Sequence, residues 1–483
     1  MNFPIRYVAR IVVEAKRPLA IGSDAILFDQ DAPVEKDCNG LPYIPGTAIT
    51  GFLRHKLVKL SSLFGEEPDS NSDQPLGSNF VTSDAYLVDD ACQVHQKPEI
   101  ISNKFLLRYH NLPIRQHVAI NAFGAAEDHS LFDQEIVFKG SRFKFEISLE
   151  LKVKNDAVWK AILNAFNDND FYLGGGSFNN FGELKVIDIF EKCYNLSTDL
   201  DTYLELTVDL NQSVNGLLNV FNKEQSQSYK LETIKLTGKD SFFHFGAGLG
   251  DNEVDKINYK EDIIIWNNNK PVWETRFVII GTSIKGAIAH RVAYHYNKTN
   301  NYTIEELVNA YVDTSTTQLN KSIDLDNFKL ASTIEELEQQ KLEIEEALNA
   351  LNKEKIDFGK LLQKYMGTNN NEVAKLFGSA KSNEKTGNAG TVIFKDVYLP
   401  IGTKEVIFYH NKIDRYTQGT IASALFSEKV LVINNIELTI KSKEAITKNS
   451  CFDLALSDLK KGLLPVGGLV NKGHGIFVEQ KTT

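Results

Sequence analysis

The sequence predicts an α+β protein in which a single fold is written twice in tandem. The core Gly-Thr-x-Ile-x-Gly occurs at residues 46–51 and again at residues 281–286, each time with an arginine shortly after it. Runs of alternating apolar residues predict strands, and turns rich in glycine and proline separate them from helical stretches. Six short marks also recur in the same order in both halves. Such an ordered set indicates a tandem duplication rather than unrelated turns that share common glycine motifs.

The spacing between matching marks shows where the two copies differ. In chain order, the matching residues are 224, 235, 313, 312, 294 and 293 positions apart: Gly22 and Gly246, Gly46 and Gly281, Phe64 and Phe377, Asp84 and Asp396, Phe132 and Phe426, Gly174 and Gly467. The spacing changes substantially at three places, so each change marks an insertion in one copy. The step from 235 to 313 places about 78 extra residues in the second copy.

The first copy has a local signal for each of its elements. A Pro/Gly turn opens a helix at Gly46 that should continue to about Leu63. Apolar alternation, turn residues and clustered glycines predict the other elements in this order: strands at 7–15 and 81–87, a hairpin at 105–137, a strand at 143–153, a helix at 157–166, a glycine-rich loop at 174–182 and a strand at 183–189.

The second copy repeats these marks and adds a helical segment. We expect a first module over residues 1–200, a boundary over 201–228 and a second module over 229–483, with the helical insertion at about 299–370. A strand at 203–210 has no assigned partner. The insertion is acidic, because residues 304–357 hold 13 Asp and Glu residues against 5 Lys and Arg residues.

The insertion also carries helix signals. Residues 332–335 form a capping box, and an amphipathic stretch of about 30 residues follows it. We expect this stretch to be one arm of a helical hairpin whose other arm is residues 304–312. Such a hairpin is either a solvated excursion packed on its own domain or a docking site for another subunit.

Composition limits the class of protein. The chain has 483 residues, of which 42% are hydrophobic and 24% charged, enough for two or three domains with ample cores. No run approaches a membrane span, and the N-terminus has no apolar signal core. The four cysteines are scattered without the spacing of a metal site or disulfide framework. We therefore expect a cytoplasmic protein that has no membrane partner.

The net charge of −10 by itself argues against a nucleic-acid binder. Residues 304–357, however, contribute −8, which leaves −2 for the rest of the chain. Bulk charge therefore neither supports nor rules out an RNA groove on the remainder.

Taken together, the marks make each half resemble the RAMP (repeat-associated mysterious protein) superfamily of CRISPR-associated proteins, in particular the backbone subunits of type III effector complexes. The first half carries the resemblance at residues 21–24, 31–34, 42–51, 63–65, 83–85 and 174–182. The second half carries it at residues 281–286, 291, 376–378, 413–415, 425–426 and 467–475. These motifs extend over nearly the whole chain except the insertion.

The resemblance implies a ferredoxin-like fold, related to the RNA-recognition module, in each half. It also implies a hairpin "thumb" that kinks the duplex of guide and target. The implied partners are a guide (CRISPR) RNA, a target RNA and other CRISPR effector subunits. The fusion of two backbone modules is similar to the type III-D-like systems.

The starts of the two repeated helices are candidate phosphate sites. A helix N-terminus presents free N–H groups and a partial positive charge, and nearby hydroxyl and cationic side chains can add contacts. The expected RNA-binding residues are Gly46, Thr47, Thr50 and Arg54 in the first copy and Gly281, Thr282, Ser283, Lys285 and Arg291 in the second. The alternative is a structural turn that caps a core helix.

The glycine-rich loops are a second candidate cradle for phosphate. Neither loop has the Lys-Ser/Thr of a nucleotide-binding P-loop. The candidate residues are Gly174, Gly175 and Gly176 in the first loop and Gly467, Gly468, Lys472 and His474 in the second.

The hairpins at 105–137 and 408–430 combine aromatic and basic residues. Aromatic faces can stack on splayed bases while cations meet phosphates, so Arg115, His117, Lys412 and Arg415 are expected to bind RNA. The alternative is a hairpin half-buried on its own module.

Cleavage of RNA by its own 2′-OH needs a group that takes a proton or holds a metal. The resemblance assigns this role to the aspartate just before a Pro-Val pair, which corresponds to Asp31, with Asp29 two residues away. A shift of 224 carries Asp31 to Asp255, and Asp251 is the alternative there. The expected activity is that of a metal-dependent endoribonuclease acting within the complex, with Mg²⁺ as the expected cofactor held by Asp31 and Asp255. In the first copy, Asp29, Asp31, Glu35 and Asp37 could equally form a solvated acidic loop.

Three functions therefore remain open. The protein is an RNA-guided ribonuclease subunit, a purely structural backbone subunit, or a guide-RNA-processing endonuclease that uses a histidine such as His110 or His410.

Overall fold

A computed structural model describes most of the chain: residues 3–23, 31–65, 77–120, 130–212, 218–221, 228–239, 242–246, 250–300, 338–339, 341–342, 370–379, 389–421 and 423–480. Nearly all of the predicted insertion at 299–370 lies outside these ranges, and so does Asp29. No helix in the described ranges is both long and apolar enough to cross a membrane.

The first module is built on an antiparallel sheet around β1 (Ile5–Ala15). Most residues of β1 are buried, because it pairs with β6 (Arg142–Leu151) on one side and with β7 (Leu184–Asn195) on the other. The sheet has the order β2-β6-β1-β7-β8, with β2 (Phe80–Thr82) and β8 (Leu218–Asn219) at its edges. Short β3 (Tyr86–Leu87) also pairs with β6.

Two helices accompany this sheet. Helix α1 (Gly46–Lys56) buries Ile49 and Leu53, and α3 (Asp156–Phe166) begins at an Asn155 cap and buries its Trp159. Phe52 of α1 packs on the rings of the α3 region, so the two helices share one core with the sheet.

The second module repeats the same order of elements. They are β9 (Lys230–Gly238), α5 (Gly281–Thr299), β13 (Val392–Phe394), β17 (Asn435–Ser442), α10 (Cys451–Lys460) and β18 (Phe477–Glu479). Its sheet order, β13-β17-β9-β18, matches β2-β6-β1-β7 strand for strand. Each module is thus a βαββαβ unit with the ferredoxin-like arrangement, and the predicted fold class is confirmed. Helix α9 (Asn371–Phe377) packs beside α5.

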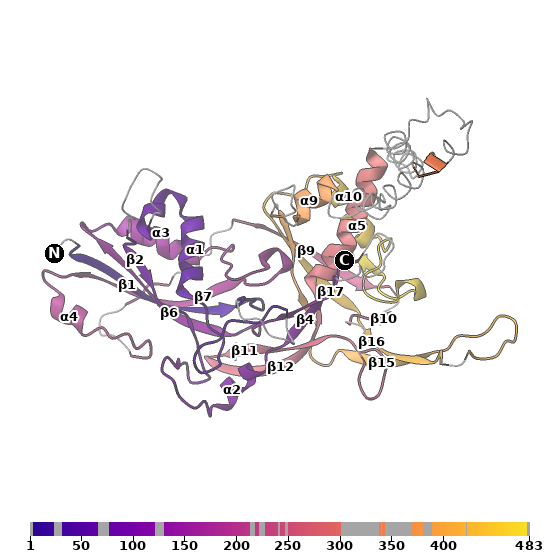
Figure 1. The fold of residues 1–483 in the computed structure, drawn as a ribbon, viewed down its shortest axis with the longest axis horizontal. Coiled ribbons are helices and arrows are strands. Elements are labelled where there is room, and N and C mark those ends of the chain that lie inside the picture. The colour runs from indigo at the N-terminus through magenta and orange to yellow at the C-terminus, as the bar shows by residue number, and fades with distance from the viewer. Residues whose placement is uncertain are drawn as a thin grey trace.

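Each module also carries a hairpin between its second and third core strands. In the first module β4 (Ile114–His117) pairs with β5 (Phe132–Glu135), and in the second β15 (Lys404–His410) pairs with β16 (Phe426–Val432). The other edge of β16 pairs with β10 (Phe242–Phe243). In Figure 1 the β15–β16 hairpin projects away from the rest of the protein, whereas β4 lies next to the second module. The predicted second hairpin is therefore confirmed.

A further hairpin explains why the spacing of the marks rises from 224 to 235. Strands β11 (Lys260–Asn267) and β12 (Lys270–Ile279) extend the chain at this point, and β12 also pairs with β14 (Val397–Tyr398). The extension reaches the first module (Figure 1). There Ile264 enters the first core, its N–H donates to Lys139 O at 2.9 Å, and Trp266 Nε1 donates to Gly140 O at 2.7 Å. The β11–β12 hairpin of the second module thus packs into the core of the first module and hydrogen-bonds to its backbone.

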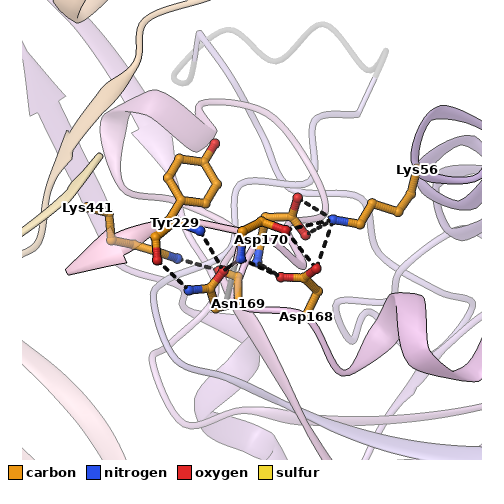
Figure 2. A network of polar contacts seen from close by, with 7 residues as sticks. Lys56, Asp168, Asn169, Asp170, Tyr229 and Lys441 are labelled. Carbon is orange, nitrogen blue, oxygen red and sulfur yellow. Dashed lines mark hydrogen bonds and ion pairs between the residues drawn. The ribbon is translucent and has the colours of Figure 1, made fainter. Parts of the chain in front are cut away.

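A polar network strengthens the junction of the modules (Figure 2). Lys56 of α1 binds Asp168 at 3.1 Å and Asp170 at 2.6 Å, just after α3. Between these acids, the side chain of Asn169 exchanges two hydrogen bonds of 3.1 Å with the backbone of Tyr229. Lys441 of β17 donates to Asn169 O at 2.5 Å. The loop after α3 is therefore tied to both modules.

Four predicted elements differ in the structure. Residues 105–110 are not part of a hairpin but form α2 (Lys104–Leu107) and η2 (Arg108–His110), because the Asn103 side chain caps the Phe105 N–H and turns Phe105 and Tyr109 toward Trp273. The expected helix over 46–63 breaks at Leu57, after which η1 (Val58–Phe64) follows.

The strand expected at 81–87 is split into β2 and β3. Between them the chain pairs instead with the segment before α1, where Ala85 and Ile44 exchange backbone hydrogen bonds.

The segment predicted as a boundary packs on the first sheet. Arg10 of β1 donates to Thr207 O at 2.8 Å and to Gln212 O at 2.5 Å. The expected strand at 203–210 is wrong: α4 (Leu200–Leu204) begins this segment, and Tyr203 packs on Tyr194 of β7.

Candidate RNA-binding surface and catalytic loops

Asp31 lies beside β5, near the loop end of the β4–β5 hairpin. Its Oδ2 accepts the N–H of Asp133 at 3.0 Å, and the carbonyl of Ala32 accepts the N–H of Glu135 at 3.1 Å. These two bonds join the loop to β5 through a parallel bridge between Ala32 and Gln134. Asp31 is an exposed residue. Its carboxylate is therefore oriented by the backbone N–H of Asp133 and still accessible to solvent.

Asp255 occupies the equivalent place in the second module. Its Oδ2 accepts the N–H of Ser427 at 2.7 Å, and the carbonyl of Lys256 accepts the N–H of Lys429 at 2.9 Å. The pairs match residue for residue, at shifts of 224 for the loop and 294 for the hairpin strand. The hydrogen bonds from the Ser427 backbone and hydroxyl lower the pKa of Asp255, which therefore carries a full negative charge at neutral pH.

Asp251 has a different environment from Asp255. It accepts the N–H groups of Glu253 and Val254, both at 2.9 Å, and the Nζ of Lys429 at 2.7 Å. The bond from Lys429, with these two backbone bonds, lowers the pKa of Asp251 to about 2. Its role in the structure is to close the turn of the loop.

The two loops differ beside their shared aspartate. The first module has a second carboxylate, Asp133, whose Oδ1 is buried without a hydrogen-bond partner in the part of the chain that the structure describes. The second module has Ser427 there. Sequence reasoning missed Asp133, although it directly follows the mark at Phe132.

The carboxylates in and beside the two aspartate loops are the candidate ligands for the expected Mg²⁺. Within the described ranges, no cluster of three or more His, Cys, Asp and Glu side chains is placed to hold a metal. Magnesium in phosphate chemistry often takes only one or two carboxylates, with water and the substrate phosphate completing its shell. Asp31 and Asp133 fit such a site, whereas Asp255 with Ser427 supplies one carboxylate.

The glycine of each repeated turn is committed to its own module. The N–H of Gly46 donates to Asp84 and the N–H of Gly281 donates to Asp396, both at 2.8 Å. A Cβ on Gly281 would lie 2.1 Å from Phe394 O, so glycine allows the helix start to approach β13. The prediction of a free N–H at this position is therefore wrong, and the buried glycines are structural.

The polar side chains around these turns divide into two groups. Thr47 and Ser283 are exposed at the helix starts, and Thr282 is half-buried. The side chains of the second group form hydrogen bonds within the protein. Thr50 donates to Gly46 O at 3.0 Å, Arg54 to Phe64 O at 2.7 Å, and Arg291 to Asp458 at 2.6 Å.

The glycine-rich loops pack against the chain just after the first strand of each module. Gly175 N donates to Ala20 O and Gly468 N donates to His244 O, both at 2.8 Å. Gly174, Gly176 and Gly467 have positive φ angles, and the loops present 3-10 turns η3 (Ser177–Asn179) and η5 (Val470–Lys472). Gly174, Gly175, Gly176, Gly467 and Lys472 are exposed, whereas His474 is buried.

Lys285 brings the first glycine-rich loop to the second module. Its Nζ donates to Asn179 Oδ1 at 3.1 Å, and burial lowers its pKa. A cavity of about 280 Å³ lies here between residues 176–179 and the chain around Gly378 and Gly390. One cationic group and several backbone groups thus line a gap between the modules.

Arg115 is buried rather than available to RNA. The side chain has no exposed surface and binds Glu261 at 2.5 and 2.9 Å and Asp396 at 2.9 Å, both in the second module. Burial opposes its charge, but the two carboxylates raise the pKa of Arg115 well above its usual value.

The histidine of each hairpin stacks on a phenylalanine. His117 lies 4.8 Å from Phe132 and His410 lies 4.7 Å from Phe426, measured between ring centroids. His117 is therefore the structural counterpart of His410, and His110 is not. Lys412 and Arg415 are exposed in the tip of the second hairpin.

Comparison with known proteins gave one family. The family model of the RAMP superfamily matches residues 12–185 and again residues 241–478. The first range runs from the end of β1 to the start of β7, and the second begins just after β9 and ends in β18. Each range therefore contains the helices, the hairpin and the aspartate loop of its module. A search of curated proteins found no match.

Proposed function

Because the chain belongs to the RAMP superfamily as a CRISPR-associated protein with two fused modules, we propose that it is a subunit of a type III RNA-guided effector complex. In this proposal both modules hold the guide RNA, and the loops with Asp31 and Asp255 cleave the complementary target RNA. The observation that carries the proposal is the repeated seat of these two aspartates. Each is exposed, and each accepts a backbone N–H from the second strand of a hairpin.

The proposed binding of RNA rests on the glycine-rich loops of both modules and on the hairpin of the second. The glycine-rich loops offer exposed backbone next to Lys472 and Lys285, and the second hairpin exposes Tyr409 and Tyr416 beside Lys412. Exposed aromatic rings can stack on bases while cations bind phosphates. Sequence specificity would come from base pairing with the guide, and the protein would read backbone and shape.

The proposed chemistry is attack of a ribose 2′-OH on the adjacent phosphorus. The 2′ oxygen loses its proton to solvent as it bonds to phosphorus, and the bond from phosphorus to the 5′ oxygen breaks as that oxygen takes a proton from water. The backbone hydrogen bond fixes Oδ2 of each aspartate and so orients the whole carboxylate. In the first module Asp31 and Asp133 would hold Mg²⁺, which neutralises charge on the phosphate when it is bound. The hydrogen bonds from Ser427 lower the pKa of Asp255, so this carboxylate is negatively charged at neutral pH and can attract a cation.

The test is cleavage of target RNA by the assembled complex with Asp31→Ala, Asp255→Ala or both. We expect each single variant to lose cutting at its own positions and the double variant to lose all cutting, while guide RNA still copurifies. Glu253→Ala is a matched control, because it removes an exposed carboxylate from the loop of Asp255. Unchanged cutting by the double variant would leave the structural role only and refute the catalytic part of the proposal.

A further inference from the structure

Four cationic side chains surround one buried carboxylate where the two modules meet. The carboxylate is that of Glu183, which directly precedes β7 and whose side chain is 3% exposed. Lys16 and Arg17 of the first module lie 3.7 and 3.6 Å from its oxygens, and Lys395 and Lys441 of the second lie at 3.6 and 3.3 Å. We call these five residues the junction cluster. It sets four positive charges against one negative charge.

Neighbouring carboxylates do not offset this excess. Glu261 and Asp396 both bind Arg115, so that group of three has one surplus negative charge. Lys139 supplies a further cation nearby, since burial lowers its pKa and repulsion from Arg17 lowers it more. The positive excess of the junction cluster therefore stands.

Burial makes this excess costly. It lowers the pKa of Lys395 to about 8 against the attraction of Glu183, and repulsion from Arg17 and Lys441 adds to the effect. Arg17 Nε and Glu183 Oε2 are also buried without a hydrogen-bond partner in the described part of the chain. Buried charge is stabilised by ions of opposite sign, so the cluster favours an anion.

Lys16 and Lys395 provide the accessible side of the cluster. Their side chains are 35% and 14% exposed, whereas that of Lys441 is 1% exposed and donates to Asn169 O. Among the described residues, neither the Lys16 nor the Lys395 ammonium group forms a hydrogen bond. Each makes an ion pair with the same oxygen of Glu183, so one ligand can reach both. The two lysines come from different modules.

The fold does not require a lysine at position 395. The spacing of 312 pairs Lys395 with Ser83 of the first module. The structure supports this equivalence, because Ser83 N donates to Glu146 O at 2.9 Å and Lys395 N donates to Thr439 O at 3.0 Å. A serine thus occupies the same place in the other copy of the fold. The lysine calls for a reason that is specific to the junction.

We propose that Lys16 and Lys395, with Arg17 beside them, form a phosphate-binding site that bridges the two modules. Each ammonium group donates to an oxygen of the phosphate, and Arg17 and Lys441 add positive potential around it. A phosphate suits the site because it has several oxygens, which can accept from donors on both sides. Since the ligand is held from both modules, its binding stabilises their docking.

The phosphate comes from one of two sources, the backbone of RNA or free inorganic phosphate. With RNA as the source, the inference rests on the RNA binding of the proposed function, and bound RNA would hold the two aspartate loops in a fixed relative position. With free phosphate as the source, the site is independent of that function. The chemistry of recognition is the same in both cases.

The first test measures the urea unfolding midpoint of the RNA-free full chain in inorganic phosphate and in chloride at equal ionic strength. Phosphate at ten times its dissociation constant should raise the ratio of folded to unfolded wild type about 11-fold. Lys16→Ser and Lys395→Ser should each lose this response, and the double variant should lose no more than either, because both lysines bind one ligand.

Lys395→Ser copies Ser83 and so should fold, which its unfolding transition in chloride verifies. Lys448→Ser is the matched control, because it removes an exposed lysine of the second module, and it should respond as the wild type does. Phosphate also stabilises proteins through its exclusion from their surface, an effect that all of these variants share.

The second test measures the affinity of the same proteins for single-stranded RNA at several salt concentrations. If RNA is the source, Lys395→Ser should weaken binding several-fold more than Lys448→Ser does and reduce the salt slope by about one. Unchanged RNA affinity with a lost phosphate response assigns the site to free phosphate. Wild-type behaviour of both lysine variants in both tests would overturn the proposal. Such a result would leave the proposed function intact, whereas a wild type that binds no RNA would refute that function and not the phosphate site.

Discussion

Arg115 and Asp396 form a fully buried ion pair of 2.9 Å across the junction of the two modules. The other oxygen of Asp396 accepts the N–H of Gly281, the first residue of α5. A single carboxylate thus connects the hairpin of the first module to the repeated turn of the second. The equivalent Asp84 binds Gly46 in the same way, so the turn is common to both modules and the link to an arginine is a feature of the junction.

Arg115→Met should destabilise the protein by about 3–5 kcal/mol, because it leaves the buried carboxylates of Glu261 and Asp396 without their cation. The measurement is the free energy of unfolding in urea. Arg415→Met, in the exposed tip of the second hairpin, is the control and should change it by less than about 0.5 kcal/mol. Equal effects of both substitutions would contradict the role of the buried pair.

Two glycines of the same motif should respond in opposite ways to alanine. Gly281→Ala should lower the free energy of unfolding by about 1–3 kcal/mol or more, since the new Cβ would meet Phe394 O at 2.1 Å. Gly286→Ala, one turn and a half further along α5, places its Cβ in open space and should raise it by about 0.5–1 kcal/mol. A lower free energy of unfolding for the Gly286→Ala variant would contradict the prediction that a Cβ is accommodated at this position.

The two aspartate loops should differ in their need for metal. Within the proposed function, Asp133→Ser should raise the Mg²⁺ concentration needed for cutting by the first module several-fold, because it removes the second carboxylate. Ser427→Asp should lower it for the second module. Magnesium titration of the two sets of cut positions tests both. An unchanged midpoint for both variants would exclude Asp133 from metal binding.

His474 should make the protein less stable in mild acid. Burial lowers the pKa of His474, so below about pH 6.5 the unfolded chain binds a proton that the folded chain does not. The free energy of unfolding therefore falls as pH decreases from about 7 to 5. His474→Phe, which copies Phe181 of the first module, should make this fall smaller.

The measurement is the urea midpoint at several pH values in that window. His117, whose pKa is also lowered by burial and then by Arg115, contributes in the same direction in both proteins and cancels in the comparison. Equal slopes for the two proteins would contradict the assignment to His474.

Local patterns predicted much of the fold and of the aspartate loops. The shift of 224 led from Asp31 to Asp255, and the two residues are equivalent in the structure. Apolar alternation and helix signals are local properties of the chain. The predicted strand or helix therefore forms wherever tertiary contacts do not favour another conformation. At residues 105–110 the Asn103 cap and the contacts with Trp273 did override them.

The candidate RNA-binding residues were harder to predict, since exposure depends on residues far apart in the sequence. Arg115 is a basic residue in a predicted hairpin, which favoured a role in binding RNA. In the structure it is buried against Glu261 and Asp396, which lie 146 and 281 positions later in the sequence. Gly46 and Gly281 have the form of a phosphate-binding turn, yet Asp84 and Asp396 accept their N–H groups.

The sequence by itself determined that the protein is a duplicated α+β fold and that each copy has an aspartate in its loop, because repeats and periodicities are written along the chain. Only the tertiary structure decided which side chains meet. It brings Asp133 to Asp31, closes the junction around Arg115, and joins His410, Glu428 and His474 from two strands and a loop. Such sets depend on register and packing between distant segments, which no local pattern records.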